Sequence, residues 1–173
     1  VRVAEALDEA GLPPGVFNLV TGGAGEVGDP LVRDPRIVGI SFTGSNAVGS
    51  ELRKVAADRG AKLQLELGGK NPAIVLADAD LDHALTHVVN GAMMSTGQKC
   101  TATSRAIVDR RVLDEFTGKL SNRIGALKVG DPQAAETQIG PAIDDKAADR
   151  IAGDIESGVK EGAQVVTGGG RLQ

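Results

Sequence analysis

Apolar and polar residues alternate along the chain in stretches of two kinds, one with the period of a helix and one with the period of a strand. Residues 81–92 show the clearest helical period, because their apolar side chains recur about every 3.6 residues on one face. Asp78 or Asp80 can cap the start of this helix. Short apolar runs bounded by glycine predict strands instead. The pattern predicts helices at 1–10, 46–58, 112–127 and 146–160, a short helical stretch ending near residue 34, and strands at 16–20, 37–42, 62–67, 73–76, 106–108 and 164–166.

This order of strands and helices predicts the fold class α/β, with a largely parallel sheet. The runs 37–40 and 73–76 are continuously apolar, which is typical of strands that other elements cover on both faces. The pattern of apolar and polar residues changes at Gly68 and Gly69. We therefore place a domain boundary between residues 67 and 68.

Composition and charge exclude several classes of function. The chain has 173 residues, a formal net charge of −4 and only three aromatic side chains, Phe17, Phe42 and Phe116. It therefore lacks both the basic surface and the aromatic platform of a nucleic-acid-binding protein. No apolar run is long enough to span a membrane, and the first residues lack the apolar core of a signal peptide. A single cysteine cannot form an internal disulfide, so we expect a cytoplasmic protein.

Two glycine-rich stretches are candidates for binding phosphate. Residues 23–28 form a literal G-x-G-x-x-G after the predicted strand at 16–20. A dinucleotide-binding loop also needs an acidic residue about 20 positions further on, at the end of the next strand. That strand ends instead in the uncharged sequence FTGS, residues 42–45, which favours a glycine-rich turn at 23–28.

The second stretch is the start of the predicted helix at 46–58. A helix N-terminus offers unpaired N–H groups and a positive dipole to an anion, and the hydroxyl of Ser45 adds a donor. Gly49 leaves a space one turn into the helix, where a flat ligand could lie close. The alternative is a serine N-cap followed by a glycine that has no binding role.

Glu66 lies at the end of the predicted strand 62–67, just before a pair of glycines. A carboxylate at this place can project into a cleft floored by backbone. Partial burial there raises the pKa of a carboxyl group and makes it a usable base. The alternative is a surface glutamate paired with Lys62 or Lys70.

Cys100 is the only cysteine, and it lies in a run of small and polar residues at 95–101. A structural cysteine is usually surrounded by apolar side chains. Here hydroxyl groups lie on both sides of the thiol and Lys99 directly precedes it, an arrangement that favours access and the reactive thiolate. Cys100 is therefore a candidate nucleophile, with an inert thiol as the alternative.

No metal site is predicted. His83 and His87 have the i, i+4 spacing of metal ligands, but they fall on the helix face opposite the apolar residues and indicate a solvated surface. The acidic residues Asp78, Asp80 and Asp82 resemble a calcium loop only in part, because the glycine and the distal glutamate of such a loop are missing.

Taken together, these stretches resemble the aldehyde dehydrogenase superfamily along essentially the whole chain. The glutamate motif LELGGKNP at 65–72 and the cysteine motif GQKC at 97–100, in this order, are the most specific. The other matching stretches are GLPPGVFN at 11–18, FTGS at 42–45 followed by Val48 and Gly49, DADLD at 78–82 and GDP at 130–132. The resemblance implies that residues 1–67 are the C-terminal part of a Rossmann-like NAD(P)-binding domain. Residues 68–173 are then the N-terminal part of an α/β catalytic domain that bears the cysteine.

The resemblance also implies oxidation of an aldehyde to a carboxylic acid with NAD or NADP. Cys100 corresponds to the nucleophile that forms a thiohemiacetal and then a thioester, and its backbone N–H corresponds to an oxyanion donor. Glu66 corresponds to the base that activates water to hydrolyse the thioester. Ser45 is implied to contact the pyrophosphate, Val48 to flank the adenine and Leu67 to approach the nicotinamide. The cofactor-binding positions are Gly22, Phe42, Gly44, Ser45, Val48, Gly49 and Leu67.

The substrate class is indicated by two further features of the resemblance. Glu66 implies release of an acid rather than transfer of the acyl group to coenzyme A. The sequence TATSR at 101–105 is most similar to members that act on semialdehydes, such as 2-oxoglutarate semialdehyde. Two alternatives are a non-catalytic relative with a binding or structural role and a cysteine hydrolase. The hydrolase needs an imidazole base, whereas His83 and His87 lie on one predicted solvent-facing helix surface.

Members of the superfamily are much longer than this chain, so we expect it to be an internal piece of such an enzyme. An upstream asparagine that donates to the oxyanion, an upstream lysine motif for the adenosine ribose and a downstream glutamate-phenylalanine motif have no match in it. The parent protein is expected to be a homo-oligomer, a dimer or a tetramer.

The purified 173-residue chain by itself is therefore expected to show little or no dehydrogenase activity. Loss of a single oxyanion donor costs about 10²–10³ in rate in other enzymes. Formation of NAD(P)H with several aldehydes measures this activity. Turnover comparable to that of an intact family member contradicts the prediction.

Overall fold

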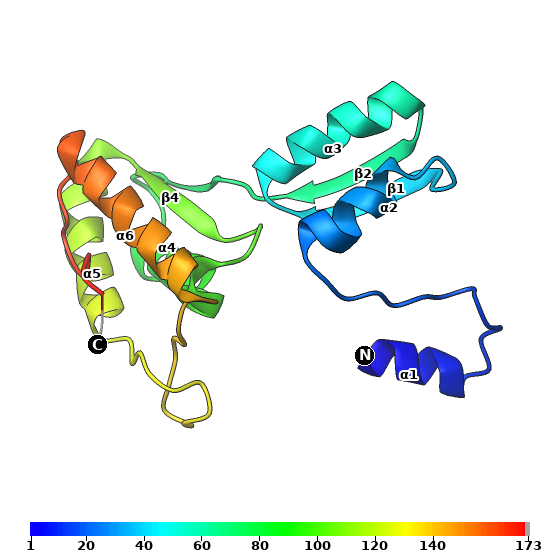
Figure 1. Ribbon diagram of the computed structural model, residues 1–173. Helices are drawn as coiled ribbons and strands as arrows, with labels where there is room; N and C mark the ends of the chain where they lie inside the picture. The colour runs from blue at the N-terminus through cyan, green and yellow to red at the C-terminus, as the bar shows by residue number, and fades with distance from the viewer. Residues whose placement is uncertain (172–173) are drawn as a thin grey trace. The chain divides into compact units, whose positions relative to one another are not determined.

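The computed structural model describes residues 1–171 and divides into two compact units, residues 1–67 and the chain from Gly68 onward (Figure 1). Each unit contains one pair of parallel strands joined by a helix. Parallel strands need such a crossover, because the chain must return to its starting edge before the second strand can run in the same direction. The structure confirms the predicted α/β class, while the assignment of the units to a cofactor domain and a catalytic domain stays a prediction.

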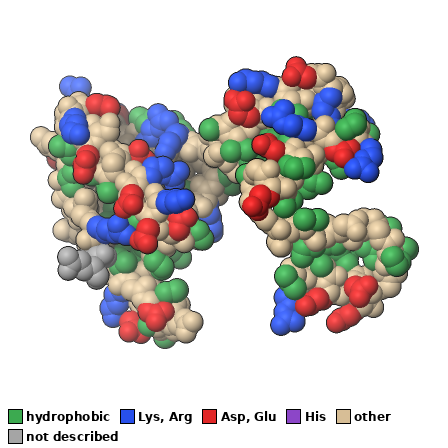
Figure 2. Space-filling view, in the orientation of Figure 1, with side chains coloured by type: hydrophobic (Ala, Val, Ile, Leu, Met, Phe, Trp, Pro, Cys, Tyr) green, Lys and Arg blue, Asp and Glu red, His purple; other side chains and the backbone are tan. Residues whose placement is uncertain are grey.

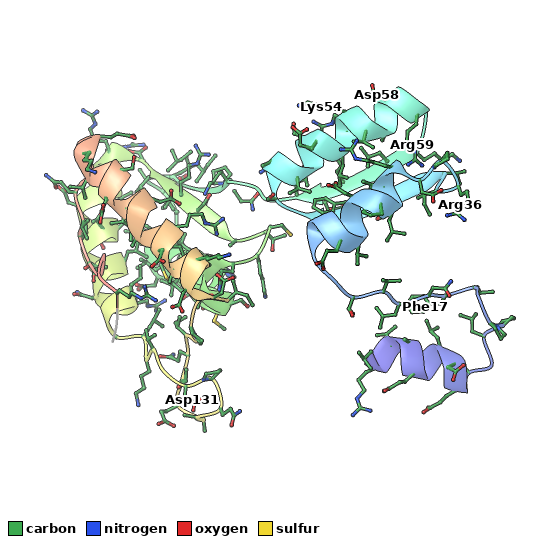
Figure 3. The ribbon with its side chains drawn as sticks, viewed as in Figure 1. Phe17, Arg36, Lys54, Asp58, Arg59 and Asp131 are labelled. Atoms are coloured by element: carbon green, nitrogen blue, oxygen red, sulfur yellow. The ribbon has the colours of Figure 1, made fainter. Side chains whose placement is uncertain are left out.

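The first unit places α3 against the parallel strands β1 and β2. Leu52 and Ala56 of this helix are buried, while acidic and basic side chains lie side by side on its outer surface (Figure 2). Near the helix end, Arg59 donates a hydrogen bond to the carbonyl oxygen of Val32 in α2 (Figure 3). Gly60 ends the helix in the left-handed conformation, which glycine adopts without strain. The elements are α1 (Arg2–Glu9), a π-helical turn η1 (Ala24–Gly28), α2 (Asp29–Arg33), β1 (Gly39–Gly44), α3 (Asn46–Arg59) and β2 (Lys62–Leu67).

The second unit packs α4 on the parallel strands β3 and β4, and α5 on α4. Val75, Leu85, Val88 and Phe116 form its buried core, in which Phe116 is only 1% exposed. Burial of such large apolar side chains is the dominant favourable term in folding. The elements are β3 (Asn71–Val75), α4 (Leu81–Met93), η2 (Met94–Gly97), β4 (Thr103–Val108), η3 (Arg110–Val112), α5 (Leu113–Gly125) and α6 (Asp145–Lys160).

Two predicted strands, at 16–20 and 164–166, do not form. Phe17 lies in an irregular segment that follows α1 and is 45% exposed (Figure 3). An extended apolar segment becomes a strand only when its N–H and C=O groups pair with a neighbouring strand. Neither segment has such a neighbour within residues 1–171, so the prediction was wrong at both places.

The expectation that the apolar strands are covered on both faces is also wrong for the part of the chain that the structure describes. Val38 beside β1, Ile74 in β3 and Ile107 in β4 are each more than half exposed. Val75, the residue next to Ile74, is buried against α4 and Phe116. Successive side chains of a strand point to opposite faces, so these strands carry one buried face and one open apolar face.

Phe116→Ala is expected to lower the free energy of unfolding by about 3–5 kcal/mol, because it leaves a cavity in the core of the second unit. Phe17→Ala is the matched control, and its effect is expected to be about 1 kcal/mol or less, since the side chain packs into no core. Chemical denaturation of the two purified variants measures both values. Equal losses for the two variants contradict this picture of the core.

Candidate active site

The chain reverses direction between α4 and Cys100 through three consecutive residues in the left-handed region. Their φ angles are 54° at Ser95, 55° at Thr96 and 67° at Gly97. A β-branched residue such as threonine rarely adopts a positive φ, and such strain persists only where surrounding contacts hold it. A Cβ at position 97 would lie 2.9 Å from the carbonyl oxygen of Ala92, which leaves no room for a larger residue. Backbone strain therefore marks the turn just before the candidate nucleophile.

Cys100 follows this turn as an exposed free thiol. On the N-terminal side of the thiol, the side-chain oxygen of Gln98 accepts a hydrogen bond of 3.0 Å from the backbone N–H of Ile143. The amide nitrogen of the same side chain donates to the hydroxyl of Thr96. Gln98 thus ties the strained turn to a segment that lies more than forty residues further along the chain.

On the C-terminal side, Asn71 holds the Cys100 segment. Its Nδ2 donates to the carbonyl oxygen of Cys100 at 2.7 Å and to that of Ala102 at 3.3 Å. Gly69 lies close by, since a Cβ there would be 3.3 Å from the same Cys100 oxygen. Sequence reasoning did not single out Asn71 or Gln98 as functional. The only sequence signal for these two residues was that each is an amide side chain within one of the two motifs. A local pattern does not indicate which backbone group such an amide contacts.

Glu66 lies near the end of β2, paired in register with Thr43 of β1, and belongs to the first unit, whereas Cys100 belongs to the second. The sequence suggested that the Glu66 carboxylate is partly buried. Within the first unit, however, this side chain is exposed. Among the described residues Glu66 forms no ion pair with Lys62 or Lys70, which removes the alternative of a paired surface glutamate. The carboxylate is therefore available for another role.

Ser45 caps the 14-residue helix α3 directly after β1. Its Oγ accepts a hydrogen bond of 3.3 Å from the backbone N–H of Val48, as an N-cap serine does. This bond uses the hydroxyl oxygen as acceptor and leaves its hydrogen free to donate, so capping and anion binding are compatible. Val48 is half exposed beside this end.

Two predicted cofactor glycines make room for side chains of the protein itself. A Cβ at Gly49 would lie 2.7 Å from both Cδ atoms of Leu67, and one at Gly44 would lie 2.4 Å from the ring of Phe42. The space that the sequence assigned to a flat ligand at Gly49 is thus filled by Leu67. The structure brings Gly49 and Leu67 together in one helix–strand contact, which the sequence alone did not indicate.

The glycine-rich stretch at 23–28 forms neither a strand nor a phosphate loop. Residues Ala24–Gly28 make a π-helical turn that leads into α2, with Gly23 as its N-cap. A Cβ at Gly22 would lie 2.4 Å from Cγ2 of Val27, so this glycine also serves local packing. The strand–loop–helix unit of a dinucleotide fingerprint is absent at this position.

The histidines lie exposed on α4, with ring centroids 4.4 Å apart. Asp80 caps this helix by accepting hydrogen bonds of 3.1 Å from the backbone N–H groups of His83 and Asp82, and the bond from His83 lowers the pKa of the Asp80 carboxyl. Within residues 1–171 no group of three His, Cys, Asp or Glu side chains is arranged to hold a metal ion. In the same range, no helix is long and apolar enough to cross a membrane.

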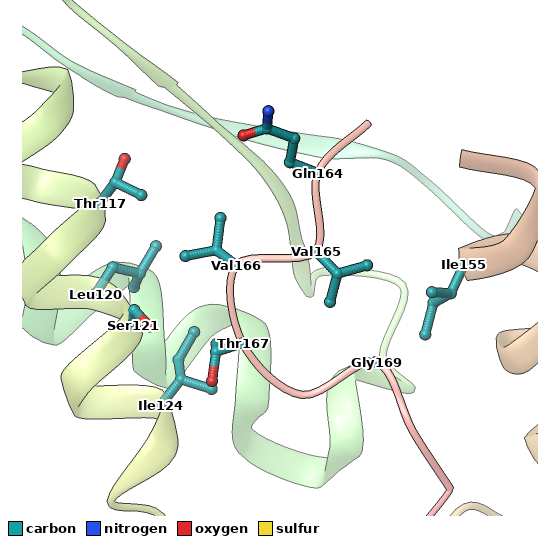
Figure 4. Close-up of a pocket in the computed structure, with 10 residues that line it drawn as sticks. All are labelled: Thr117, Leu120, Ser121, Ile124, Ile155, Gln164, Val165, Val166, Thr167 and Gly169. Carbon is teal, nitrogen blue, oxygen red and sulfur yellow. The ribbon is translucent and has the colours of Figure 1, made fainter. Parts of the chain in front are cut away.

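A separate pocket lies between α5, α6 and the irregular segment 164–169 (Figure 4). Leu120, Ile124, Ile155 and Val166 give it a mainly apolar lining. None of the predicted site residues lines it, so this pocket is not the candidate active site.

The sequence model of the aldehyde dehydrogenase family matches residues 1–173. The chain belongs to this family. It is 44% identical over 172 residues to the alpha-ketoglutaric semialdehyde dehydrogenase of Bacillus subtilis strain 168, a match that covers 99% of the chain and 35% of that protein.

Solved structures of aldehyde dehydrogenases have the same fold as this chain. HpcC from Thermus thermophilus is 43% identical with a TM-score of 0.96, covering 99% of this chain and 33% of that one. Betaine aldehyde dehydrogenase from Staphylococcus aureus in complex with NAD⁺ is 36% identical with a TM-score of 0.97, covering 99% and 34%. These similarities confirm the resemblance seen in the sequence. The chain spans about a third of the length of these aldehyde dehydrogenases.

Gly97→Ala is expected to lower the free energy of unfolding of this aldehyde dehydrogenase chain by about 1–3 kcal/mol, because alanine is strained at positive φ and its Cβ meets the Ala92 carbonyl. Gly118→Ala in α5 is the control, since a Cβ there meets nothing within 4 Å. This change is expected to stabilise the helix by up to about 1 kcal/mol. Denaturant titration of both variants gives the two values, and a neutral Gly97→Ala argues against the strained turn.

Proposed function

We propose that the protein carrying this chain oxidises an aldehyde to a carboxylic acid with NAD⁺ or NADP⁺, using Cys100 as nucleophile and Glu66 as base. The observation that carries the proposal is the exposed Cys100 thiol on a strained, doubly anchored segment in a member of the aldehyde dehydrogenase family. Backbone strain concentrates at functional sites, where surrounding contacts hold it.

The first step is attack of the Cys100 thiolate on the aldehyde carbon. The new C–S bond forms while the carbonyl π electrons move to oxygen, which gives a thiohemiacetal. Negative charge then develops on that oxygen, and a backbone N–H aimed at it stabilises the transition state. The N–H of Cys100 is the proposed donor, and the contacts of Asn71 with the next peptide groups support a fixed backbone at this residue.

Oxidation of the thiohemiacetal to a thioester on Cys100 requires a hydride acceptor, and NAD(P)⁺ would supply this chemistry when bound. The N-terminal end of α3 fits the pyrophosphate of this cofactor. Ser45 and the helix N-terminus offer hydrogen-bond donors and positive potential to a phosphate group. Val48 exposes apolar surface beside that end, and Leu67 lies across Gly49 at the end of β2. The NAD⁺ complex of the related betaine aldehyde dehydrogenase supports NAD⁺ as the first cofactor to test.

Hydrolysis completes the cycle. Glu66 accepts a proton from water, the water oxygen attacks the thioester carbon, and the C–S bond breaks to release the acid and the thiolate. Only four residues separate Glu66 from Asn71, whose side chain donates to the carbonyl oxygen of Cys100. Within residues 1–171 the carboxylate of Glu66 is exposed and forms no ion pair, so it is accessible to water.

A semialdehyde is the proposed substrate class. The support is the 44% identity with the alpha-ketoglutaric semialdehyde dehydrogenase of Bacillus subtilis, together with the sequence at 101–105. The alternative is a non-catalytic member of the family with a binding role. The two differ in one measurable property, because only a catalytic member forms a covalent acyl intermediate on Cys100.

Glu66→Gln is expected to keep formation of the thioester and to block its hydrolysis, because the neutral amide cannot accept a proton from water. Rapid mixing with aldehyde and NAD⁺ should therefore release about one NADH per site in a burst, followed by turnover at least about 10²-fold slower than that of the unchanged protein. Glu51→Gln, an exposed change on α3, is the matched control and should leave turnover intact. Cys100→Ala should abolish the burst itself.

These variants separate the outcomes. A burst in Glu66→Gln with an acyl adduct on Cys100, located by peptide mass spectrometry, supports both roles. Normal steady-state turnover in Glu66→Gln removes the glutamate from the mechanism. Activity retained in Cys100→Ala overturns the proposed nucleophile, and absence of turnover in the unchanged protein with semialdehydes and other aldehydes favours the non-catalytic alternative.

A further inference from the structure

We infer that Asn71 is a positioning residue for Cys100, whose side-chain amide fixes the backbone from which the thiol and the Cys100 N–H project. The inference deepens the proposed function and rests on it for its catalytic consequence. The fixing of the backbone is a property of the second unit alone and can be measured separately.

Both hydrogens of the Asn71 side-chain amide are used in hydrogen bonds to backbone carbonyl oxygens. Nδ2 of Asn71 lies 2.7 Å from the Cys100 carbonyl oxygen and 3.3 Å from that of Ala102. A side-chain NH₂ group carries two donor hydrogens, so these contacts use its full donor capacity. These carbonyls belong to Cys100 itself and to the residue two positions after it, where the chain leaves the strained turn and enters β4.

The register of the strands explains why a side chain supplies these donors. Asn71 pairs with Thr103 at the start of the β3–β4 ladder, and the next pair is Pro72 with Arg105, so one residue of β4 is skipped. The carbonyls of Cys100 and Ala102 precede Thr103, so they lie beyond the paired residues of the ladder, and the side-chain amide of Asn71 supplies their donor there.

The anchors on the two sides of Cys100 differ in what they hold. Gln98 ties the strained turn to the backbone of Ile143, before the thiol. Asn71 acts on the carbonyl of Cys100 itself, which shares its peptide group with the N–H of Thr101. Loss of Asn71 therefore frees the Cys100 peptide while the turn remains anchored through Gln98.

Precise placement of a nucleophile matters for rate more than for binding. A displacement of about 1 Å of a reacting group can cost about 10²-fold in rate, because the reacting atoms leave the attack geometry. A positioning residue is therefore expected to change kcat with little change in KM, since the substrate still binds the same surface.

The test uses Asn71→Asp in the protein as it exists, with Asn122→Asp on the exposed surface of α5 as the matched control. The aspartate has the size of asparagine but its ionised carboxylate only accepts hydrogen bonds, so both donors are lost and two carbonyl oxygens face a negative charge. Hydrogen–deuterium exchange of the peptide covering residues 98–103 is expected to be about tenfold faster in Asn71→Asp than in the control. With aldehyde and NAD⁺, kcat per titrated Cys100 is expected to fall about 10–100-fold, with KM values within about threefold.

Each result decides the inference. Exchange at 98–103 equal to that of Asn122→Asp overturns it. Faster exchange with an unchanged kcat per titrated thiol also overturns it, because Asn71 then serves only folding. If the unchanged protein oxidises no aldehyde, the proposed function fails, and the exchange comparison alone then decides whether Asn71 fixes the Cys100 backbone.

Discussion

Parallel strand pairing is the constraint on which both units depend. Two strands that run in the same direction cannot be joined by a tight turn, so each pair needs a crossover helix, α3 in the first unit and α4 in the second. A crossover creates two junctions, one where a strand enters a helix and one where a helix returns to a strand. Ser45 lies at the first kind of junction, after β1, and Cys100 lies at the second kind, before β4. The proposed anion contact and the proposed nucleophile are thus consequences of the same topological requirement.

The return from α4 to β4 is the costly part of this arrangement. Ser95 and Thr96 adopt left-handed backbone angles, and such residues cost of order 1–3 kcal/mol each. Such strain persists where surrounding contacts hold it, and the hydrogen bonds of Gln98 and Asn71 hold the turn and the segment that follows it. The hydrogen bonds that hold the strained turn therefore also hold the backbone on both sides of Cys100.

Local signals in the sequence predicted local structure well. An Asp80 cap begins α4, and the strand expected at 62–67 is β2. The failures have a common cause. The segments 16–20 and 164–166 have strand-like patterns but no partner within residues 1–171, and Ile74 faces solvent although its run of neighbours is apolar throughout. Pairing and coverage depend on other segments, which a local pattern does not record.

The sequence by itself determined the α/β class, the aldehyde dehydrogenase family, and the candidate nucleophile and base, because these follow from residue type and from spacing along the chain. Only the tertiary structure decided that Leu67 fills the space at Gly49 and that Asn71 holds the carbonyl of Cys100. Asn71 and Cys100 are 29 residues apart, and they meet because β3 and β4 pair in one register with an irregularity beside Pro72. Such a meeting is set by the packing of whole elements, so no motif around either residue could specify it.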